Sequence, residues 1–289
     1  QRAEERGLTP AVLTFDTHPD TLVFGQEVPL INSPEGRAEI IRRVYGIDSV
    51  IFIHFNRAVM QMPWQEFMSS LVNELHAVHV VVGYDFSCGY KGEGRAVKIA
   101  GWCSEHGLGC DIIDAVKLDG DVVSSTRIRE LLHQGQVWEA SSLLGRLYSV
   151  QGEVIHGKNR GGRLLGFPTA NLAPTPTMLP KPGVYVTLAT PSESAGSGLP
   201  FVLDPAHPTS NTYPAVTNIG YNPTFGPGAL TVETHLLDFD ADLYGKHLEV
   251  AFVERLRGEV TFTGPDSLVA QIKKDADQAR KILETVTGE

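Results

Sequence analysis

The pattern of apolar residues changes at Gly145, and this change constrains the fold more than any other feature of the chain. Before it, short apolar runs alternate with segments of helical periodicity, which predicts a parallel sheet with helices on both faces. After it, apolar and polar residues alternate with period two, and Gly and Pro interrupt the pattern often, which is typical of a small antiparallel barrel. A chain of 289 residues is expected to form about two domains, which we place at 1–145 and 146–289.

The first half contains short apolar runs that we predict as strands buried on both faces. They are residues 11–15, 49–53, 78–82 and 110–113. We predict helices that begin after Ser33 and that span residues 64–75, 96–106, 125–133 and 137–144. The opening residues are typical of the last turns of a helix that ends at Gly7. We therefore expect this helix to begin before Gln1 and the sequence to be an N-terminally incomplete piece.

In the second half, the alternating pattern predicts the strands of the barrel. They are residues 148–155, 183–189, 215–219, 230–237 and 247–252. An amphipathic helix over 266–285 is expected to pack on the barrel. The Pro-, Ser- and Gly-rich segment 191–214 is interpreted as a long surface hairpin or loop.

The amino-acid composition argues against several classes of protein. With 24 Lys and Arg against 34 Asp and Glu, the net charge is −10, which argues against a nucleic-acid-coating or membrane-coating role. No apolar run approaches the roughly 20 residues of a membrane span. The three cysteines have no C-x-x-C spacing, which favours a reducing compartment. We therefore expect a cytoplasmic protein that acts on small molecules, with no nucleic-acid or membrane partner, and leave its oligomeric state open.

A glycine-rich basic segment begins the second half. Gly157, Gly161 and Gly162 alternate with Lys158 and the nearby Arg163, and such a loop brings backbone N–H groups and cations to phosphate oxygens. On spacing alone, a basic β-turn is the commoner explanation.

Two further segments carry candidate polar groups. Thr169 and Asn171 face the same way in an extended chain, so their oxygens suit Mg²⁺, although a solvent-facing turn explains them equally simply. Strand alternation places Thr231, Glu233 and His235 on one face. A carboxylate there can act as a general base for an alcohol, whereas a solvated glutamate is the ordinary alternative.

Taken together, these segments resemble the flavokinase module of the bacterial bifunctional riboflavin kinase/FMN adenylyltransferases, or FAD synthetases. The resemblance rests on GEVIHGKNRGGRLLGFPTANL, KPGVYV, AVTNIGYNPTFG, VETHLLDFDADLYGKHLEV and QIKKDADQAR, which extend over nearly all of residues 147–285. It implies a six-stranded barrel that transfers the γ-phosphate of ATP to the ribityl 5′-hydroxyl of riboflavin.

The resemblance also implies roles for individual residues. Thr169 and Asn171 would hold Mg²⁺ with the nucleotide phosphates, the loop 157–163 would cover those phosphates, Glu233 would accept the hydroxyl proton, and Arg280 would reach the flavin.

The first half resembles the Rossmann-like nucleotidyltransferase domain of the same family. FDTHP matches its F-x-P-H-P segment with Thr17 in place of proline, VGYDFSCG matches its G-x-[DN]-F-x-F-G loop with Cys88 in place of phenylalanine, and SSTRIR matches its S-S-T-x-I-R signature. The adenylyltransferase site implied by these matches consists of His18, Asp85, Ser125, Thr126 and Arg129. Hydroxyls and N–H groups at a helix N-terminus bind phosphate, although an ordinary helix cap is the simpler explanation of SSTR.

The H-x-G-H motif that grips ATP phosphates in this family does not occur in residues 1–289. We therefore expect the kinase half to be active and FAD synthesis by this chain to be impaired. Two alternatives stay open: a nucleotidyltransferase of other specificity with an inert barrel, and a non-catalytic flavin carrier. Neither alternative requires Glu233 to act as a base.

Overall fold

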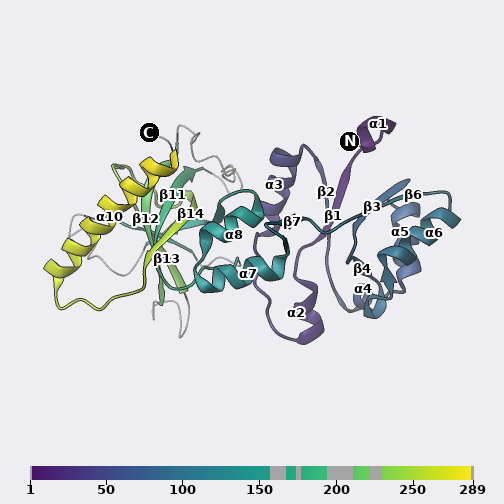
Figure 1. Cartoon of the computed structure of the whole chain (residues 1–289), viewed down its shortest axis with the longest axis horizontal. Coiled ribbons are helices and arrows are strands. Elements are labelled where there is room, and N and C mark those ends of the chain that lie inside the picture. The colour runs from purple at the N-terminus through teal and green to yellow at the C-terminus, as the bar shows by residue number, and fades with distance from the viewer. Residues whose placement is uncertain (1, 157–166, 174–176, 194–210, 222–229, 288–289) are drawn as a thin grey trace. The chain divides into compact units, whose positions relative to one another are not determined.

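The structure is a computed structural model that describes residues 2–156, 167–173, 177–193, 211–221 and 230–287 (Figure 1). It contains two compact units. The barrel unit comprises residues 1–12, 29–50 and 124–289, and the α/β unit comprises residues 13–28 and 51–123. Because the units interleave along the chain, they do not test the domain boundary expected after residue 145, which stays a prediction.

Six antiparallel strands close into a barrel in the order β10-β13-β12-β11-β14-β9. The strands are β9 (Tyr148–Ile155), β10 (Ala170–Leu172), β11 (Gly183–Ser192), β12 (Tyr213–Tyr221), β13 (Leu230–Leu236) and β14 (His247–Arg257). Closure pairs each strand on both sides, so that the barrel has no open sheet edge.

Aromatic side chains fill much of the barrel interior. Tyr148, Tyr185 and Phe252 are fully buried, and the rings of Tyr185 and Phe252 meet edge to face at 5.3 Å. Such pairs add directional packing to the free energy gained by burying the rings. The three rings therefore join strands β9, β11 and β14 across the core.

Buried threonines continue this interior across three neighbouring strands. The hydroxyl of Thr217 lies 2.8 Å from that of Thr187 and 3.0 Å from that of Thr234. These contacts satisfy hydroxyl groups that burial removes from water. Because Thr234 is directed inward, its chain neighbours Glu233 and His235 face the outside of the barrel.

Helix α10 (Pro265–Thr287) lies along the barrel over β11 and β12 (Figure 1). Ala276 and Ala279 are buried in this contact, as the helical spacing predicted. Arg257 of β14 donates from Nη2 to a carboxylate oxygen of Asp275 at 2.7 Å. This ion pair anchors the first half of the helix to the end of β14.

The other helices of the barrel unit are α1 (Arg2–Arg6), α3 (Pro34–Tyr45), α7 (Ser125–Gln134) and α8 (Val137–Leu144). Leu131 and Leu132 of α7 and Val137 of α8 share one apolar core with the barrel interior. Leu30 and Thr177 form a parallel bridge, which joins the segment before α3 to the barrel.

The α/β unit contains a parallel pair of strands, β3 (His79–Gly83) and β6 (Gly109–Ile113). Its remaining elements are α2 (Pro19–Phe24), α4 (Arg57–Gln61), α5 (Trp64–Asn73), β4 (Ser87–Cys88), a 3₁₀ turn (Tyr90–Gly92), β5 (Gly94–Arg95), α6 (Ala96–Glu105), β7 (Lys117–Leu118) and β8 (Asp121–Val122). Met68, Ile99 and Cys103 form its buried core.

The structure explains why the VGYDFSCG loop ends in glycine. Gly89 has φ +74°, and a Cβ at this position would lie 2.5 Å from the backbone of Trp64. Any other residue would be strained and would collide with helix α5, so only a glycine lets the loop pass this close to the helix.

The predicted fold class is confirmed: an α/β part with parallel strands precedes an antiparallel barrel and a C-terminal helix. The prediction of strands buried on both faces is wrong for the first half. Among the described residues, strand β1 (Ala11–Phe15) pairs only with β2 (Ser49–Ile53), and β3 pairs only with β6. Val81 is 55% exposed, and of the residues in these four strands only Val82 is buried.

The barrel contains one more strand than the alternating pattern showed. Residues 170–172 form the short strand β10, where the sequence indicated only an extended segment. The predicted surface segment 191–214 joins two paired strands, β11 and β12, but residues 194–210 lie outside the described residues.

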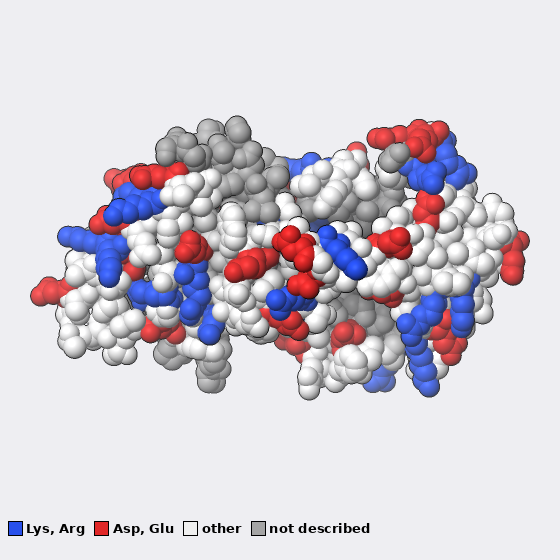
Figure 2. Space-filling model, viewed as in Figure 1, with Lys and Arg blue, Asp and Glu red and all other residues white. Residues whose placement is uncertain are grey.

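Acidic and basic side chains are interspersed on the face of the molecule that Figure 2 shows. Among the described residues, no helix combines the length and the apolar composition that crossing a membrane requires.

Candidate active site

A row of three polar residues crosses the outer face of the barrel. Asn171 of β10 pairs with Glu233 of β13, which pairs on its other side with Asn218 of β12. Directly opposed residues place their Cβ atoms about 4.5–5.5 Å apart on the same face of a sheet. The structure therefore brings Asn171 and Glu233 together, as their predicted shared site requires, and adds Asn218, which the sequence analysis did not assign.

The neighbours of this row confirm that it faces outward. Ala170 and Leu172 on either side of Asn171, and Val232 before Glu233, belong to the buried core. Asn171 and Glu233 themselves are only half-buried. Their polar groups are therefore accessible to a ligand on the outside of the barrel.

Thr169 lies just before β10, and the chain around it is fixed by a side chain of β13. The Nδ1 atom of His235 lies 2.8 Å from the carbonyl oxygen of Pro168. A carbonyl oxygen only accepts, so the imidazole N–H donates this hydrogen bond. The bond holds the segment that carries Thr169 against the strand that carries Glu233.

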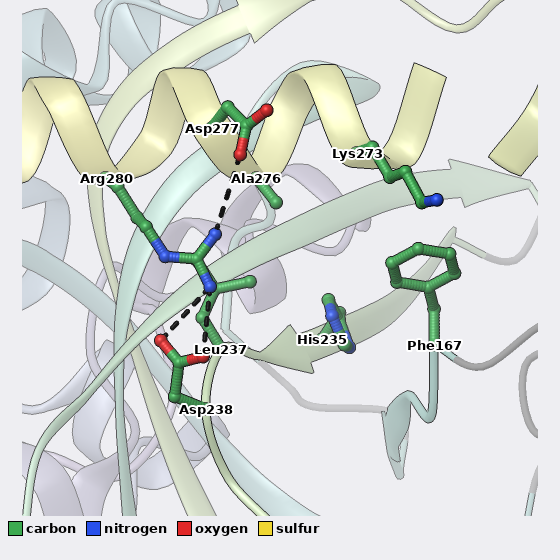
Figure 3. A pocket seen from close by; sticks show the side chains of 8 residues that line it. All are labelled: Phe167, His235, Leu237, Asp238, Lys273, Ala276, Asp277 and Arg280. Atoms are coloured by element: carbon green, nitrogen blue, oxygen red, sulfur yellow. Dashed lines mark hydrogen bonds and ion pairs between the residues drawn. The ribbon is translucent and has the colours of Figure 1, made fainter. Parts of the chain in front are cut away.

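A cavity of about 260 Å³ lies between β13 and helix α10, and His235, two residues after Glu233 on β13, lines it (Figure 3). It is lined by Phe167, His235, Leu237, Asp238, Lys273, Ala276, Asp277 and Arg280. The rings of Phe167 and His235 meet edge to face at 5.4 Å and 80°. One aromatic wall therefore faces charged side chains of the helix.

Charges in this cavity are largely paired. Arg280 donates from Nη2 to both carboxylate oxygens of Asp238 at 3.1 Å, and its Nη1 lies 3.8 Å from Asp277. Among the described residues, Lys273 has no ion-pair partner, and its side chain extends toward Phe167 in Figure 3. The cavity therefore offers one cation to a ligand, while Arg280 is already held by carboxylates.

The donor set beside the cavity fits a hard cation. Thr169 and Asn171 carry a hydroxyl and an amide oxygen, which are ligand types that Mg²⁺ accepts, and the carboxylate of Glu233 is the neighbour of Asn171. The described residues contain no group of three His, Cys, Asp or Glu side chains that would hold a metal by themselves. Such a set suits an ion whose other ligands are water and nucleotide phosphates.

The glycine-rich loop with Gly157, Lys158, Gly161, Gly162 and Arg163 lies outside the described residues. Its role toward phosphate stays a prediction. The last described residue before it, His156, stacks on Tyr244 with ring centroids 3.7 Å apart.

The predicted adenylyltransferase residues lie in both compact units. In the barrel unit, Ser124 caps α7 by accepting from Arg127 N at 3.2 Å, which leaves Ser125 and Thr126 exposed in the first turn. Arg129 donates from Nε to the carbonyl oxygen of Pro29 at 3.3 Å. The cap is thus Ser124, and the next two hydroxyls are accessible.

In the α/β unit, His18 caps α2, with Nδ1 accepting from Asp20 N at 3.2 Å. Asp85 is exposed in the turn that follows β3. The structure thus describes the predicted residues of the two units separately, and their common site stays a prediction.

Sequence reasoning missed Phe167 and Asn218 as site residues. Phe167 precedes the PTAN segment directly, and Asn218 stands at an outward position of the predicted strand 215–219. Alternation within that strand was a usable signal for Asn218, but its pairing with Glu233 depends on the register between strands.

Comparisons with known proteins cover both parts of the chain. A riboflavin kinase family model matches residues 144–283, and an FAD synthetase family model matches residues 1–127.

The similar curated proteins include two bacterial enzymes named bifunctional riboflavin kinase/FMN adenylyltransferase. That of Listeria monocytogenes is 34% identical over 284 residues, which cover 97% of this chain and 84% of the relative. That of Bacillus subtilis is 33% identical over 285 residues, with 96% and 84% covered.

A solved structure from Streptococcus pneumoniae, described as a macrolide-efflux protein, has the same fold along nearly the whole chain. It superposes with a TM-score of 0.79 at 28% identity and covers 96% of this chain and 86% of its own. Identity and coverage of this extent, together with both family models, show that the chain belongs to the family of bifunctional riboflavin kinase/FMN adenylyltransferases.

Proposed function

We propose that the barrel of this chain transfers the γ-phosphate of ATP to the 5′-hydroxyl of riboflavin, and that the first half serves the adenylylation of FMN to FAD. The observation that carries the kinase proposal is the pairing of Asn171 with Glu233 on the outer face of the barrel, beside a cavity. Family membership supports both activities.

Glu233 acts as the general base in this proposal. As the 5′-oxygen of riboflavin bonds to the γ-phosphorus, the bond from that phosphorus to the β,γ-bridging oxygen breaks, and the hydroxyl proton passes to the Glu233 carboxylate. The products are FMN and ADP. Phosphoryl transfer depends mainly on positioning and charge neutralisation, and a base in contact with the hydroxyl completes this arrangement.

Thr169 and Asn171 would hold Mg²⁺ together with the phosphates of the nucleotide. When bound, Mg²⁺ neutralises charge on the transferring phosphoryl oxygens. The hydroxyl and the amide contribute neutral oxygens, so that the nucleotide itself completes the coordination. We propose the same phosphate-covering role as the resemblance implies for the loop with Gly157, Lys158, Gly161, Gly162 and Arg163, which lies outside the described residues.

The cavity takes the flavin ring. Phe167 offers an aromatic contact to the ring, and Arg280 places a charge at the rim of the cavity. His235 lies two residues from Glu233 along β13, so it lines the part of the cavity that is nearest to the base. Two residues of a strand span about 6.5 Å, which is comparable to an extended ribityl chain. A ring in the cavity therefore places the terminal hydroxyl beside Glu233.

For the adenylyl transfer, we propose that Ser125 and Thr126 bind nucleotide phosphates at the N-terminus of α7 with Arg129, and that His18 and Asp85 of the α/β unit also serve this reaction. Two exposed hydroxyls in the first turn of a ten-residue helix support this assignment.

The test is FMN formation from riboflavin, ATP and Mg²⁺, followed by chromatography, for the natural chain and for Glu233→Gln. We expect the substitution to lower kcat by about 10²–10⁴-fold with little change in riboflavin binding. Glu254→Gln, an exposed glutamate of β14, is the matched control and should keep full activity.

Two outcomes would contradict the kinase proposal. Full FMN formation by E233Q would show that Glu233 is not the base, and no FMN formation by the natural chain would favour an inert barrel beside a nucleotidyltransferase of other specificity. Flavin binding that is indifferent to ATP and Mg²⁺, without FMN formation, would favour a flavin carrier.

A further inference from the structure

His235 occupies the junction between the two halves of the kinase site. It follows Glu233 on the outer face of β13 and lines the cavity with Phe167 (Figure 3). Its second contact, the hydrogen bond to the carbonyl oxygen of Pro168, reaches the segment that precedes β10. Among the described residues that line the cavity, only His235 forms a hydrogen bond to that segment.

The hydrogen bond between His235 and Pro168 lies just beyond the end of the pairing between β10 and β13. The ladder between β10 and β13 consists of Ala170↔Thr234 and Asn171↔Glu233 and does not extend to Thr169. In the same register Thr169 would lie opposite His235, but no backbone pairing holds it there. The imidazole of His235 therefore supplies the contact that the backbone ladder does not.

Thr169 is consequently fixed from both sides. The residue after it, Ala170, is part of the barrel, and the residue before it, Pro168, is held by His235. Proline also restricts its own φ and the conformation of Phe167. The direction of the Thr169 hydroxyl relative to Asn171 thus depends on the side chain of His235.

We propose that His235 is a positioning residue for phosphoryl transfer, which sets the Thr169 hydroxyl for the metal–nucleotide complex and holds Phe167 as a wall of the flavin cavity. The inference rests on the proposed kinase function. Groups that orient metal ligands typically change metal affinity or activity by about 10–100-fold when they are removed.

The experiment compares three substitutions of His235. Leu removes the donor, Asn keeps an N–H donor near the position of Nδ1, and Gln places its donor farther along the side chain. His247→Leu, a half-buried histidine of β14 in the same barrel, is the matched control. Thermal unfolding of each variant shows whether the barrel stays folded.

The main readout is calorimetric binding of ADP with and without Mg²⁺. We expect H235L to weaken Mg²⁺-dependent ADP binding about 10–100-fold, with a parallel fall in kcat, and to leave metal-free ADP binding within about threefold. H235N should recover most of the loss, H235Q should recover little, and H247L should behave like the natural chain. Should H235L fail to fold, the contrast between H235N and H235Q carries the test.

The results separate this inference from the proposed function. If the natural chain makes FMN and E233Q does not, but H235L keeps normal Mg²⁺-dependent ADP binding, the positioning role is overturned and the kinase stands. Equal defects in H235N and H235Q overturn the role of the hydrogen bond. If the natural chain makes no FMN and binds ADP without regard to Mg²⁺, the kinase proposal itself fails, and the inference fails with it.

Discussion

The barrel and the α/β unit are built from similar apolar residues, yet they bury them to very different extents. In the barrel, closure pairs each strand twice, and Tyr185, Val186 and Phe252 have no exposed surface. In the α/β unit, β3 and β6 form a two-stranded sheet in which Val81 is 55% exposed. Closure of a sheet, rather than the apolar content of its strands, decides how firmly a row of side chains is held.

This difference has a consequence for function. The proposed kinase residues Asn171 and Glu233 lie on neighbouring strands of a closed barrel, so register fixes their separation. The proposed adenylyltransferase residues His18 and Ser125 belong to helix ends in different units. No shared strand register fixes this second pair.

The largest expected effect comes from truncating each core. Phe252→Ala removes a fully buried ring from the barrel and should cost about 3–5 kcal/mol of unfolding free energy and most FMN formation. Ile99→Ala, in the core of the α/β unit, should destabilise that unit by about 2–5 kcal/mol and leave FMN formation intact. Hydrogen exchange of each unit measures the change, and loss of FMN formation in I99A would contradict the independence of the two.

The second effect concerns the two activities. A polypeptide of residues 1–289 alone should make FMN readily and FAD at least about 100-fold more slowly, because these residues contain no H-x-G-H motif to hold ATP phosphates. The measurement follows FMN and FAD formation from riboflavin in one reaction, with added FMN as a separate substrate. Comparable rates of the two steps would show that the remaining residues suffice for adenylylation.

The third effect is a dependence of the unfolding free energy on pH, which is caused by a residue of the barrel unit. Glu249 of β14 is 2% exposed; Ser149 donates to its Oε1 at 2.7 Å, and burial raises the pKa of this carboxyl from 4.5 to about 7. Between these values the unfolded chain has lost the proton that the folded chain keeps, so the unfolding free energy falls as pH rises toward 7.

Glu249→Gln removes the free-energy cost of ionising a buried carboxyl group. We expect the variant to be about 3 kcal/mol more stable than the natural chain at pH 8 and equally stable at pH 4. Urea unfolding at both pH values checks this, with the exposed Glu153→Gln of β9 as the control. A gain that is the same at both pH values would show that the charge of Glu249 is not its cause.

The smallest effect is expected at the rim of the cavity. Arg280 and its partner Asp238 are 40% and 78% exposed, so Arg280→Ala should cost less than about 1 kcal/mol of stability. If Arg280 borders the flavin ring, the KM for riboflavin should rise by about 3–10-fold while the KM for ATP changes little. Lys281→Ala, the exposed neighbour on α10, is the control, and an unchanged riboflavin KM in R280A would remove Arg280 from the flavin site.

Much of the fold was predictable because it depends on local periodicity. Alternation in period two located five of the six barrel strands, and helical spacing located α10 with Ala276 and Ala279 on its buried face. The same alternation placed Glu233 and His235 on one face of β13. The four strands predicted in the first half match β1, β2, β3 and β6 to within one residue, whereas the two-residue strands β4, β5, β7 and β8 were missed. The burial of the four was predicted wrongly, because burial depends on how many neighbours a strand has.

The sequence by itself determined which residues face outward along each strand and which segments carry oxygen ligands, since both follow from the order of residues in one stretch of chain. Only the tertiary structure decided that Asn218 and Asn171 flank Glu233, that α10 closes a cavity over β13, and that His235 holds Pro168. These contacts join residues tens of positions apart, and their geometry is set by the register and closure of the barrel, which no local pattern specifies.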